Sequence, residues 1–213
     1  MSNNKPFVST SNRKYRSVLI FGPPGAGKGT LGKFLSSAGN HFHLSSGDIF
    51  RGLSPESPAG KIYHSYAGKG HLVPDDVTIG IWHHYVEGLI ATNRYFPHQQ
   101  LLLLDGIPRT VPQTQLLEPY IDLIHIIVLE TANTGELLKR MKRRGLIERR
   151  IDDFDEKVLH TRIKVYEETT QHILKHYPAD KISRFNADQR PLEVLRDVLG
   201  SLSDLLSHPE NPA

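Results

Sequence analysis

A glycine-rich segment near the N-terminus has the residue types and spacing that bind phosphate. It reads GPPGAGKGT over residues 22–30, directly after the apolar segment 17–21 and before a helical pattern. Glycines allow the backbone to curl until successive N–H groups point at phosphate oxygens, and Lys28 adds a cation. The N-terminus of the following helix adds partial positive charge. This order of strand, loop, lysine and helix predicts a site for nucleotide phosphates rather than an ordinary turn.

Arginines and aspartates elsewhere in the chain are suited to the same chemistry. Guanidinium groups bind phosphate oxygens bidentately and stabilise the charge on a phosphoryl group during its transfer. The excess of basic residues is concentrated in residues 139–150. Asp105 follows the apolar segment 101–104, at the edge where open α/β sheets present ligand groups, so it either holds a hydrated Mg²⁺ or only caps the next turn. Asp48 is a weaker metal candidate, because aspartate also caps helices well.

Apolar runs and helical patterns alternate along the chain and predict the elements that position these residues. Strand-like runs occupy residues 17–21, 41–44, 101–104, 124–129 and 182–185. Helical patterns occupy residues 29–37, 75–93, 135–144, 153–177 and 191–206. Continuous apolar strands that alternate with helices are typical of a parallel α/β sheet covered on both faces.

Two segments do not fit this alternation. The chain between residues 44 and 101 is too long for one crossover helix and predicts a small helical insertion at about 46–75. The charged segment 143–153 predicts a compact flap, at about 144–153. We therefore expect one α/β domain over residues 17–206, between a flexible extension at 1–16 and a flexible tail at 207–213.

Composition excludes several classes of protein. The chain has 213 residues, 38 % hydrophobic and 23 % charged, which suits one substantial soluble domain. It has no cysteine, so disulfides and thiolate zinc sites are excluded, and no apolar run is long enough to span a membrane. The first sixteen residues lack the apolar core of a secretory signal. No amphipathic helical stripe runs through them, which favours an extension of a cytoplasmic protein over an organelle transit peptide. His172 and His176 could share a helix face, but they have no evident third ligand, so we expect no zinc.

Five motifs together resemble those of the adenylate kinase family. They are GPPGAGKGT (22–30), LSSGDIFR (44–51), GKGHLVPDD (68–76), LLDGIPRTVPQ (103–113) and RRIDDFDEKVLHTR (149–162), in the order and approximate spacing of that family. The resemblance covers nearly all of residues 17–206. It implies a P-loop kinase core with five parallel strands, a nucleoside-monophosphate-binding insertion and a short lid over ATP. It also implies a monomeric ATP:AMP phosphotransferase that reversibly makes two ADP, uses Mg²⁺ with ATP, and binds neither nucleic acid nor membrane.

The resemblance assigns a role to each candidate residue. The catalytic residues would be Lys28, Arg109, Arg144, Arg150 and Arg162. ATP would contact Gly25, Ala26, Gly27, Lys28, Gly29, Thr30, Arg140, Arg144 and Gln189. AMP would contact Ser46, Arg51, His71, Leu72, Val73, Gly106, Arg109, Gln113, Arg150 and Arg162. Asp105 would hold Mg²⁺ through water, with Asp48 as the weaker candidate, and Asp152 and Asp153 would hold the lid arginines.

Several alternatives remain open from the sequence. The Gln113 amide matches the adenine edge, whereas Ile107 and Ser46 depart from the residues usual in the family, so a UMP/CMP kinase or a kinase of another nucleoside monophosphate is one alternative. A P-loop protein that binds nucleic acid through its basic segment is another, although no recognition helix or aromatic platform is evident. Arg140 is nearly as well explained by a solvated helix face as by contact with adenine.

Overall fold

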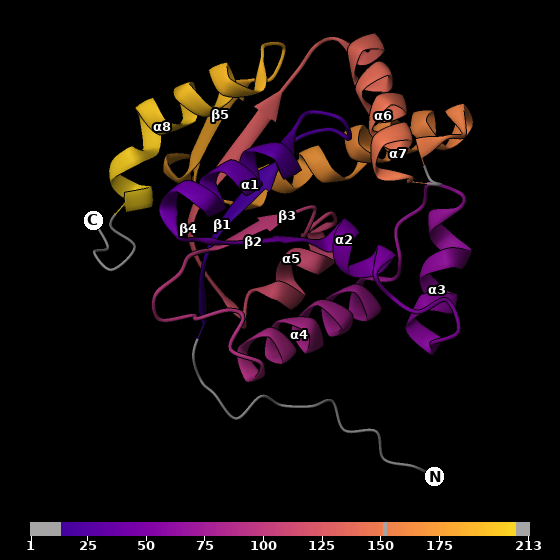
Figure 1. The fold of residues 1–213 in the computed structure, drawn as a ribbon, viewed down its shortest axis with the longest axis horizontal. Coiled ribbons are helices and arrows are strands. Elements are labelled where there is room, and N and C mark those ends of the chain that lie inside the picture. The colour runs from indigo at the N-terminus through magenta and orange to yellow at the C-terminus, as the bar shows by residue number, and fades with distance from the viewer. Residues whose placement is uncertain (1–13, 151–152, 208–213) are drawn as a thin grey trace.

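A five-stranded parallel sheet forms the centre of this computed structural model, which describes residues 14–150 and 153–207 (Figure 1). The strand order is β2-β3-β1-β4-β5. The strands are β1 (Tyr15–Phe21), β2 (Phe42–Ser45), β3 (Leu102–Asp105), β4 (Ile121–Glu130) and β5 (Ile182–Asn186). Leu102, Leu103 and Leu104 of β3 are all fully buried, because helices cover both faces of the sheet. The predicted parallel α/β fold is confirmed.

Helices form a layer on each face of the sheet. In chain order, the helices are α1 (Lys28–Gly39), α2 (Ser46–Arg51), α3 (Pro58–Ala67), α4 (Asp75–Ala91), α5 (Val111–Leu117), α6 (Thr134–Glu148), α7 (Glu156–Glu168) and α8 (Pro191–Ser207), with short 3₁₀ helices η2 (Thr170–His176) and η3 (Ala179–Lys181). Helix α3 lies away from the sheet (Figure 1). One buried cluster joins the sheet to α4, α5 and η2 and includes Trp82 and Ile173. The other joins it to α1, α6, α7 and α8 and includes Leu35 and Met141. In the described part of the chain, no helix is long and apolar enough to cross a membrane.

The first strand begins earlier than predicted. Residues 15 and 16 were expected in the flexible extension, but they belong to β1. Tyr15 is buried, and its hydroxyl donates a hydrogen bond to Glu87 of α4. The remainder of the predicted extension, apart from Lys14, and almost all of the predicted tail lie outside the described residues.

The prediction of one helix over residues 153–177 is wrong. Helix α7 ends at Glu168, and the 3₁₀ helix η2 begins at Thr170. Thr170 is buried, and its hydroxyl donates to the carbonyl of Arg109. The tighter η2 buries Ile173 and Leu174 against the sheet. The break therefore depends on a contact with a loop 61 residues away, which helical periodicity does not record.

Helix α6 continues beyond its predicted end at residue 144. It runs to Glu148, and the backbone N–H of Arg149, in a left-handed conformation, donates to the carbonyl of Gly145. Gly145 is a plausible helix end in sequence, but here it lies inside the helix. A Cβ added to Gly145 would lie 3.0 Å from the Cβ of Asp153, so glycine lets the chain after α6 pack against it. Residues 144–148 of the predicted flap are therefore helical, and the predicted insertion contains the helices α2 and α3.

Candidate functional site

A cleft of about 920 Å³ opens at the edge of the sheet where β1, β2 and β3 end. Ligands of open α/β sheets bind at this carboxyl edge. Most of the predicted site residues line the cleft: Gly25, Ala26, Gly27, Lys28, Gly29, Thr30, Asp48, Arg51, Leu72, Asp105, Gly106, Arg109, Arg140, Arg144, Arg150, Arg162 and Gln189. Four predicted residues do not line it: Ser46, His71, Val73 and Gln113.

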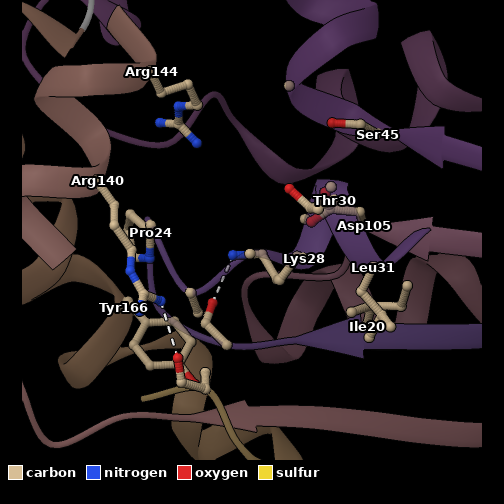
Figure 2. A pocket seen from close by; sticks show the side chains of 18 of the residues that line it. Ile20, Pro24, Lys28, Thr30, Leu31, Ser45, Asp105, Arg140, Arg144 and Tyr166 are labelled. Atoms are coloured by element: carbon tan, nitrogen blue, oxygen red, sulfur yellow. Dashed lines mark hydrogen bonds between the residues drawn. The ribbon is translucent and has the colours of Figure 1, made fainter. Parts of the chain in front are cut away.

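The glycine-rich loop connects β1 to α1 in the predicted order. Gly22, Gly25 and Gly27 have positive φ angles of 148°, 86° and 98°, which side-chain-bearing residues rarely adopt. A Cβ on Gly25 would also lie 2.8 Å from the carbonyl oxygen of Leu137. The Nζ of Lys28 donates to the carbonyls of Gly22 at 2.8 Å and Pro23 at 3.0 Å. The loop therefore holds its own lysine at the floor of the cleft, across from Arg140 and Arg144 (Figure 2).

Lys28 and Asp105 place opposite charges beside the loop. Burial lowers the pKa of Lys28 to about 8, although the negative charge of Asp105 opposes this shift. Burial alone would raise the pKa of Asp105, but His43 and the cations Lys28 and Arg109 hold it below its usual value. The Nε2 of His43 lies 3.9 Å from the Oδ2 of Asp105. His43 was not identified from the sequence. Its position becomes clear only from the pairing of β2 with β3, which places His43 two residues before Ser45, the partner of Asp105.

Asp105 fits a magnesium ion that arrives with a nucleotide. Mg²⁺ usually takes one or two carboxylates from the protein and completes its shell with phosphate oxygens and water. Among the described residues, no group of three or more histidine, cysteine, aspartate or glutamate side chains could hold a metal ion by itself. Asp105 lines the cleft together with Lys28 and Gly29, and 8 % of the residue is exposed. One anionic carboxylate at this place suits such a shared ion.

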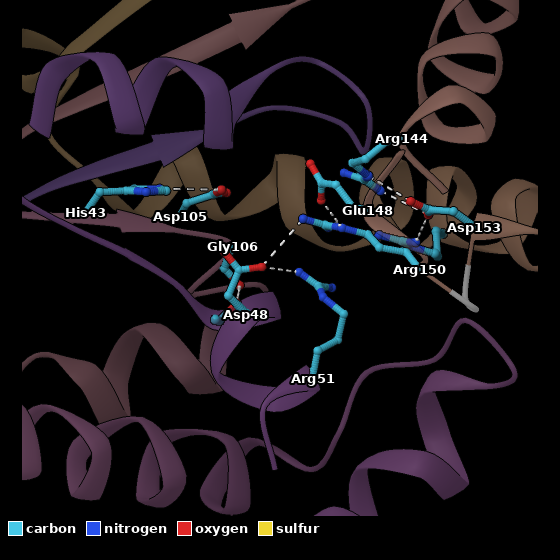
Figure 3. Close-up of polar contacts among 11 residues, drawn as sticks. His43, Asp48, Arg51, Asp105, Gly106, Arg144, Glu148, Arg150 and Asp153 are labelled. Atoms are coloured by element: carbon cyan, nitrogen blue, oxygen red, sulfur yellow. Dashed lines mark hydrogen bonds and ion pairs between the residues drawn. The ribbon is translucent and has the colours of Figure 1, made fainter. Parts of the chain in front are cut away.

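A buried carboxylate joins two of the predicted catalytic arginines. Asp153 has no exposed side-chain surface and accepts hydrogen bonds from Arg144 at 2.7 and 2.9 Å and from Arg162 at 2.6 Å (Figure 3). Burial alone would raise the pKa of Asp153, but these arginines and Arg150 hold it below its usual value. This arrangement agrees with the predicted role of Asp153 in holding lid arginines. Asp152 lies outside the described residues.

A second carboxylate joins the other arginines. Asp48 accepts a hydrogen bond from Arg51 at 2.5 Å, and Nη2 of Arg150 lies 3.5 Å from the same oxygen (Figure 3). Arg150 also donates to Glu148. Burial and the positive charges of Arg144 and Arg51 lower the pKa of Arg150. Asp48 therefore engages arginines here, and its predicted weaker role as a magnesium ligand stays a prediction.

The segment after β3 carries the predicted acceptor residues. The carbonyl of Gly106 accepts hydrogen bonds from Ser46 Oγ and Arg109 Nε, both at 2.7 Å. Burial and the positive charge of Arg162 lower the pKa of Arg109 to about 10. Gln113, in the first turn of α5, is 1 % exposed and bonded to the backbone of Arg109. Ser46 and Gln113 thus lie directly behind the cleft and contact residues that line it.

The other end of the cleft carries two predicted ATP contacts, Arg140, which was predicted at the adenine, and Gln189. Arg140 donates through Nη1 to the carbonyl of Ala187 at 2.9 Å and lies 3.4 Å from Glu136. Gln189 donates to Asp197 at 2.7 Å and to the carbonyl of Asn186 at 3.0 Å. Both residues line the cleft. Arg140 is bonded to the segment between β5 and α8, and Gln189, which belongs to that segment, is bonded to the end of β5 and to α8.

A phosphate loop at the carboxyl edge of a parallel sheet, with arginines from several elements in the same cleft, defines the class of P-loop kinases. The sequence matches the family model described as adenylate kinase over residues 20–182. The chain belongs to the adenylate kinase family, a family of phosphotransferases.

Relatives named adenylate kinase come from several bacteria. One from Flavobacterium psychrophilum is 33 % identical over 198 residues, which cover 90 % of this chain and 98 % of the relative. One from Flavobacterium johnsoniae is 36 % identical over 166 residues, which cover 76 % of this chain and 84 % of the relative. One from Rhodopirellula baltica is 34 % identical over 197 residues and 90 % of both chains. The similarity therefore covers at least three quarters of this chain and more than four fifths of each of these relatives.

Proposed function

We propose that this chain transfers the γ-phosphoryl group of ATP reversibly to AMP, giving two ADP. The observation that carries the proposal is a single cleft with a phosphate loop and with arginines from three further parts of the chain: α2, the segment after β3, and the segment from α6 to α7. One phosphate loop accounts for a donor nucleotide. The additional arginines, which the loop does not need, account for an acceptor that is itself a phosphate.

The donor half consists of the loop and the residues at the far end of the cleft. The backbone of Gly25 to Thr30 and the ammonium of Lys28 bind the β- and γ-phosphates. Arg140 would lie beside the adenine of ATP, and Gln189 would also contact ATP. Asp105 would hold, through water, a magnesium ion bound with ATP, and that ion would offset negative charge on the phosphates.

The acceptor half lies around α2 and the segment after β3. Arg51 and Arg109 line the cleft and would bind the AMP phosphate bidentately. Gln113, which lies directly behind the cleft, would read the adenine edge. Ser46, Gly106 and the backbone of residues 71–73 form the wall of this half. AMP then presents an oxygen that is already ionised at neutral pH, so the transfer needs no general base.

The transfer itself depends on positioned cations. A phosphoryl group in flight spreads charge over three equatorial oxygens, and Arg144, Arg150 and Arg162 would bridge donor and acceptor around it. Their present partners, Asp153, Asp48 and Glu148, hold the guanidinium groups close to the cleft before nucleotides bind. Segments 46–75 and 144–153 would close over the nucleotides and exclude water.

The chain would act as a monomer, since every residue assigned to ATP and AMP belongs to one copy. The cytoplasmic location predicted from the sequence stays a prediction. Neither nucleic acid nor a membrane has a role in this proposal, because Arg140, Arg144 and Arg150 of the basic segment line the nucleotide cleft.

A coupled assay tests the proposed function directly. The purified chain is given MgATP with AMP, GMP, CMP or UMP, and the diphosphate products are measured. We expect two ADP for each AMP consumed, with AMP preferred over the other acceptors. Chelation should abolish the reaction without lowering the melting temperature, and Mg²⁺ should restore it. Folded protein that phosphorylates UMP or CMP in preference to AMP, or no monophosphate at all, contradicts the proposal.

A further inference from the structure

The side-chain amide of Gln113 lies between two groups with opposite hydrogen-bonding requirements. Its Oε1 accepts a hydrogen bond from the backbone N–H of Arg109 at 2.8 Å. Its Nε2 donates to Oδ1 of Asp75 at 2.9 Å. Gln113 is 1 % exposed, so water cannot easily replace either partner. Asp75 was not among the residues predicted from the sequence; it reaches Gln113 from the first turn of α4, 38 residues away in the chain.

These two partners allow only one orientation of the amide. A backbone N–H can only donate, and a carboxylate can only accept. If the Gln113 amide turned over, Oε1 would face the Asp75 carboxylate, and the Nε2 group would face the Arg109 N–H. Both buried hydrogen bonds would then be lost, and like partial charges would be opposed.

Thr110 holds Asp75 in the position that this arrangement requires. The Thr110 hydroxyl donates to Oδ1 of Asp75 at 2.7 Å and accepts from the backbone N–H of Gln113 at 3.2 Å, as the N-cap of α5. One carboxylate oxygen therefore accepts from both Thr110 and Gln113. The N-termini of α4 and α5 and the Gln113 amide form one connected network.

The orientation of an amide decides which purine it matches. Adenine offers a donor at N6 beside an acceptor at N1, whereas guanine offers an acceptor at O6 beside a donor at N1. An amide satisfies either edge only by turning over. After its two bonds to Asp75 and Arg109, Gln113 retains one N–H donor and one oxygen lone pair for a base.

We propose that Asp75 is a positioning residue that fixes the Gln113 amide in the orientation for adenine and thereby disfavours guanine at the acceptor site. The inference rests on the proposed function, because it concerns the base of the acceptor nucleotide. Asp75 acts through Gln113 and contacts no reacting atom. The competing account is that Asp75 only ties α4 to α5, in which case its loss would lower stability and leave the preference between bases unchanged.

Steady-state kinetics with AMP and GMP separate the two accounts. In Asp75→Ala we expect the ratio of kcat/KM for AMP to that for GMP to fall about tenfold, the scale of one lost hydrogen bond to a charged group. The change should arise from a higher KM for AMP, with KM for ATP unaltered. Asp75→Asn should show a smaller fall, since its amide can face Gln113 with either a donor or an acceptor. The Asp75→Asn variant also provides the test if the Asp75→Ala variant does not fold.

The neighbouring aspartate provides a matched control. Asp76 is exposed and lies in the same first turn of α4, so Asp76→Asn removes the same charge from the same helix end. Its AMP-to-GMP ratio should equal that of the wild type. In a Gln113→Ala background, Asp75→Ala should leave that ratio unchanged, because Asp75 would no longer have an amide to orient.

The outcomes distinguish failure of this inference from failure of the proposed function. If the wild-type chain makes no ADP from ATP and AMP, the proposed function fails and the inference falls with it. If the wild type prefers AMP but both Asp75 variants keep its AMP-to-GMP ratio within about twofold, the inference alone is overturned. An equal loss of discrimination from Asp75→Ala with and without Gln113 would also overturn it.

Discussion

The phosphate loop and the arginine cluster, which comprises Arg51, Arg109, Arg144, Arg150 and Arg162, line the same cleft but are built differently. The loop is one continuous segment, and its lysine is held by carbonyls five and six residues away. The cluster draws its members from α2, the segment after β3, α6 and its C-terminal end, and α7. Carboxylates as well as packing hold it together, notably Asp153 and Asp48.

This difference separates a site that folding completes from one that a ligand must rearrange. The loop meets phosphate with backbone N–H groups and a lysine bonded only to neutral carbonyls. Four of the five arginines already bind carboxylates, whereas Arg109 donates to the carbonyl of Gly106. A phosphate must therefore compete with those anions or share the guanidinium groups with them. We therefore expect replacement of the loop lysine to affect chemistry without affecting stability, and changes in the cluster to affect both.

The largest expected effect comes from removing the lysine of the loop. Lys28→Met should lower kcat by about 10² to 10³, the scale for loss of one preorganised stabilising group. The fold should survive, because the substitution removes a buried cation whose pKa is already lowered by burial. Single-turnover kinetics and far-ultraviolet circular dichroism measure the two quantities. Turnover close to that of the wild type would show that the donor phosphates do not lie at this loop.

Among changes at the arginine cluster, the largest effect on stability should come from replacing Asp153, the carboxylate that joins two of its arginines. Asp153→Asn should lower the free energy of unfolding by about 2 to 3 kcal/mol, below the range for fully buried pairs because Arg144 and Arg162 are partly exposed to the cleft. Activity should fall as well, since both arginines lose their anchor. Denaturant unfolding measures the change, with Asp122→Asn on an exposed position of β4 as the control.

The pH dependence of that stability difference has a definite sign. Because the folded-state pKa of Asp153 lies below its usual value, its contribution is present above the unfolded pKa of about 4 and is lost as pH falls through the folded pKa. The melting temperatures of the wild type and Asp153→Asn should therefore converge below about pH 4. A difference that stays constant into strong acid would argue against the ion pairs.

Two arginines should separate binding from chemistry. Arg51→Ala should raise KM for AMP about 10- to 100-fold, as expected for lost charge-assisted hydrogen bonds, because it holds the acceptor in ground and transition states alike. Arg150→Ala should mainly lower kcat, since it meets the phosphoryl group only during transfer. Initial-rate kinetics with each nucleotide varied provide the comparison. Effects of both variants on ATP affinity alone would place these arginines in the donor half.

The smallest effect should appear in the alkaline pH profile. Lys28 has a pKa of about 8, so it is cationic below that pH and neutral above it, and kcat/KM for ATP should fall as pH rises through this value. Bound phosphates favour the ammonium, so kcat should fall only at higher pH. Lys28→Arg should be less active but should lose this alkaline decline, because a guanidinium stays charged. A profile that is flat to pH 10 in the wild type would contradict the assignment.

Features that depend on residues close together in the sequence were predicted correctly, whereas features that depend on distant partners were not. The five strands were recognised from continuous apolar runs, and the helix N-termini that begin at Asp75 and Pro191 from local signals. The break after Glu168 and the continuation of α6 to Glu148 were not recognised. Both depend on distant or opposing partners, namely the carbonyl of Arg109 and the packing of Asp153 against Gly145.

The sequence by itself determined the phosphate loop, its lysine, the parallel sheet and the placement of Asp105 at a strand end, because each is written in consecutive residues with a characteristic spacing. Only the tertiary structure decided that Asp153 joins Arg144 to Arg162, that His43 lies beside Asp105 and that Asp75 orients Gln113. Those contacts join separate elements, and their partners are set by how the elements pack. Side-chain charge and hydrogen-bonding capacity are visible in a sequence, but the choice among many possible partners requires the folded chain.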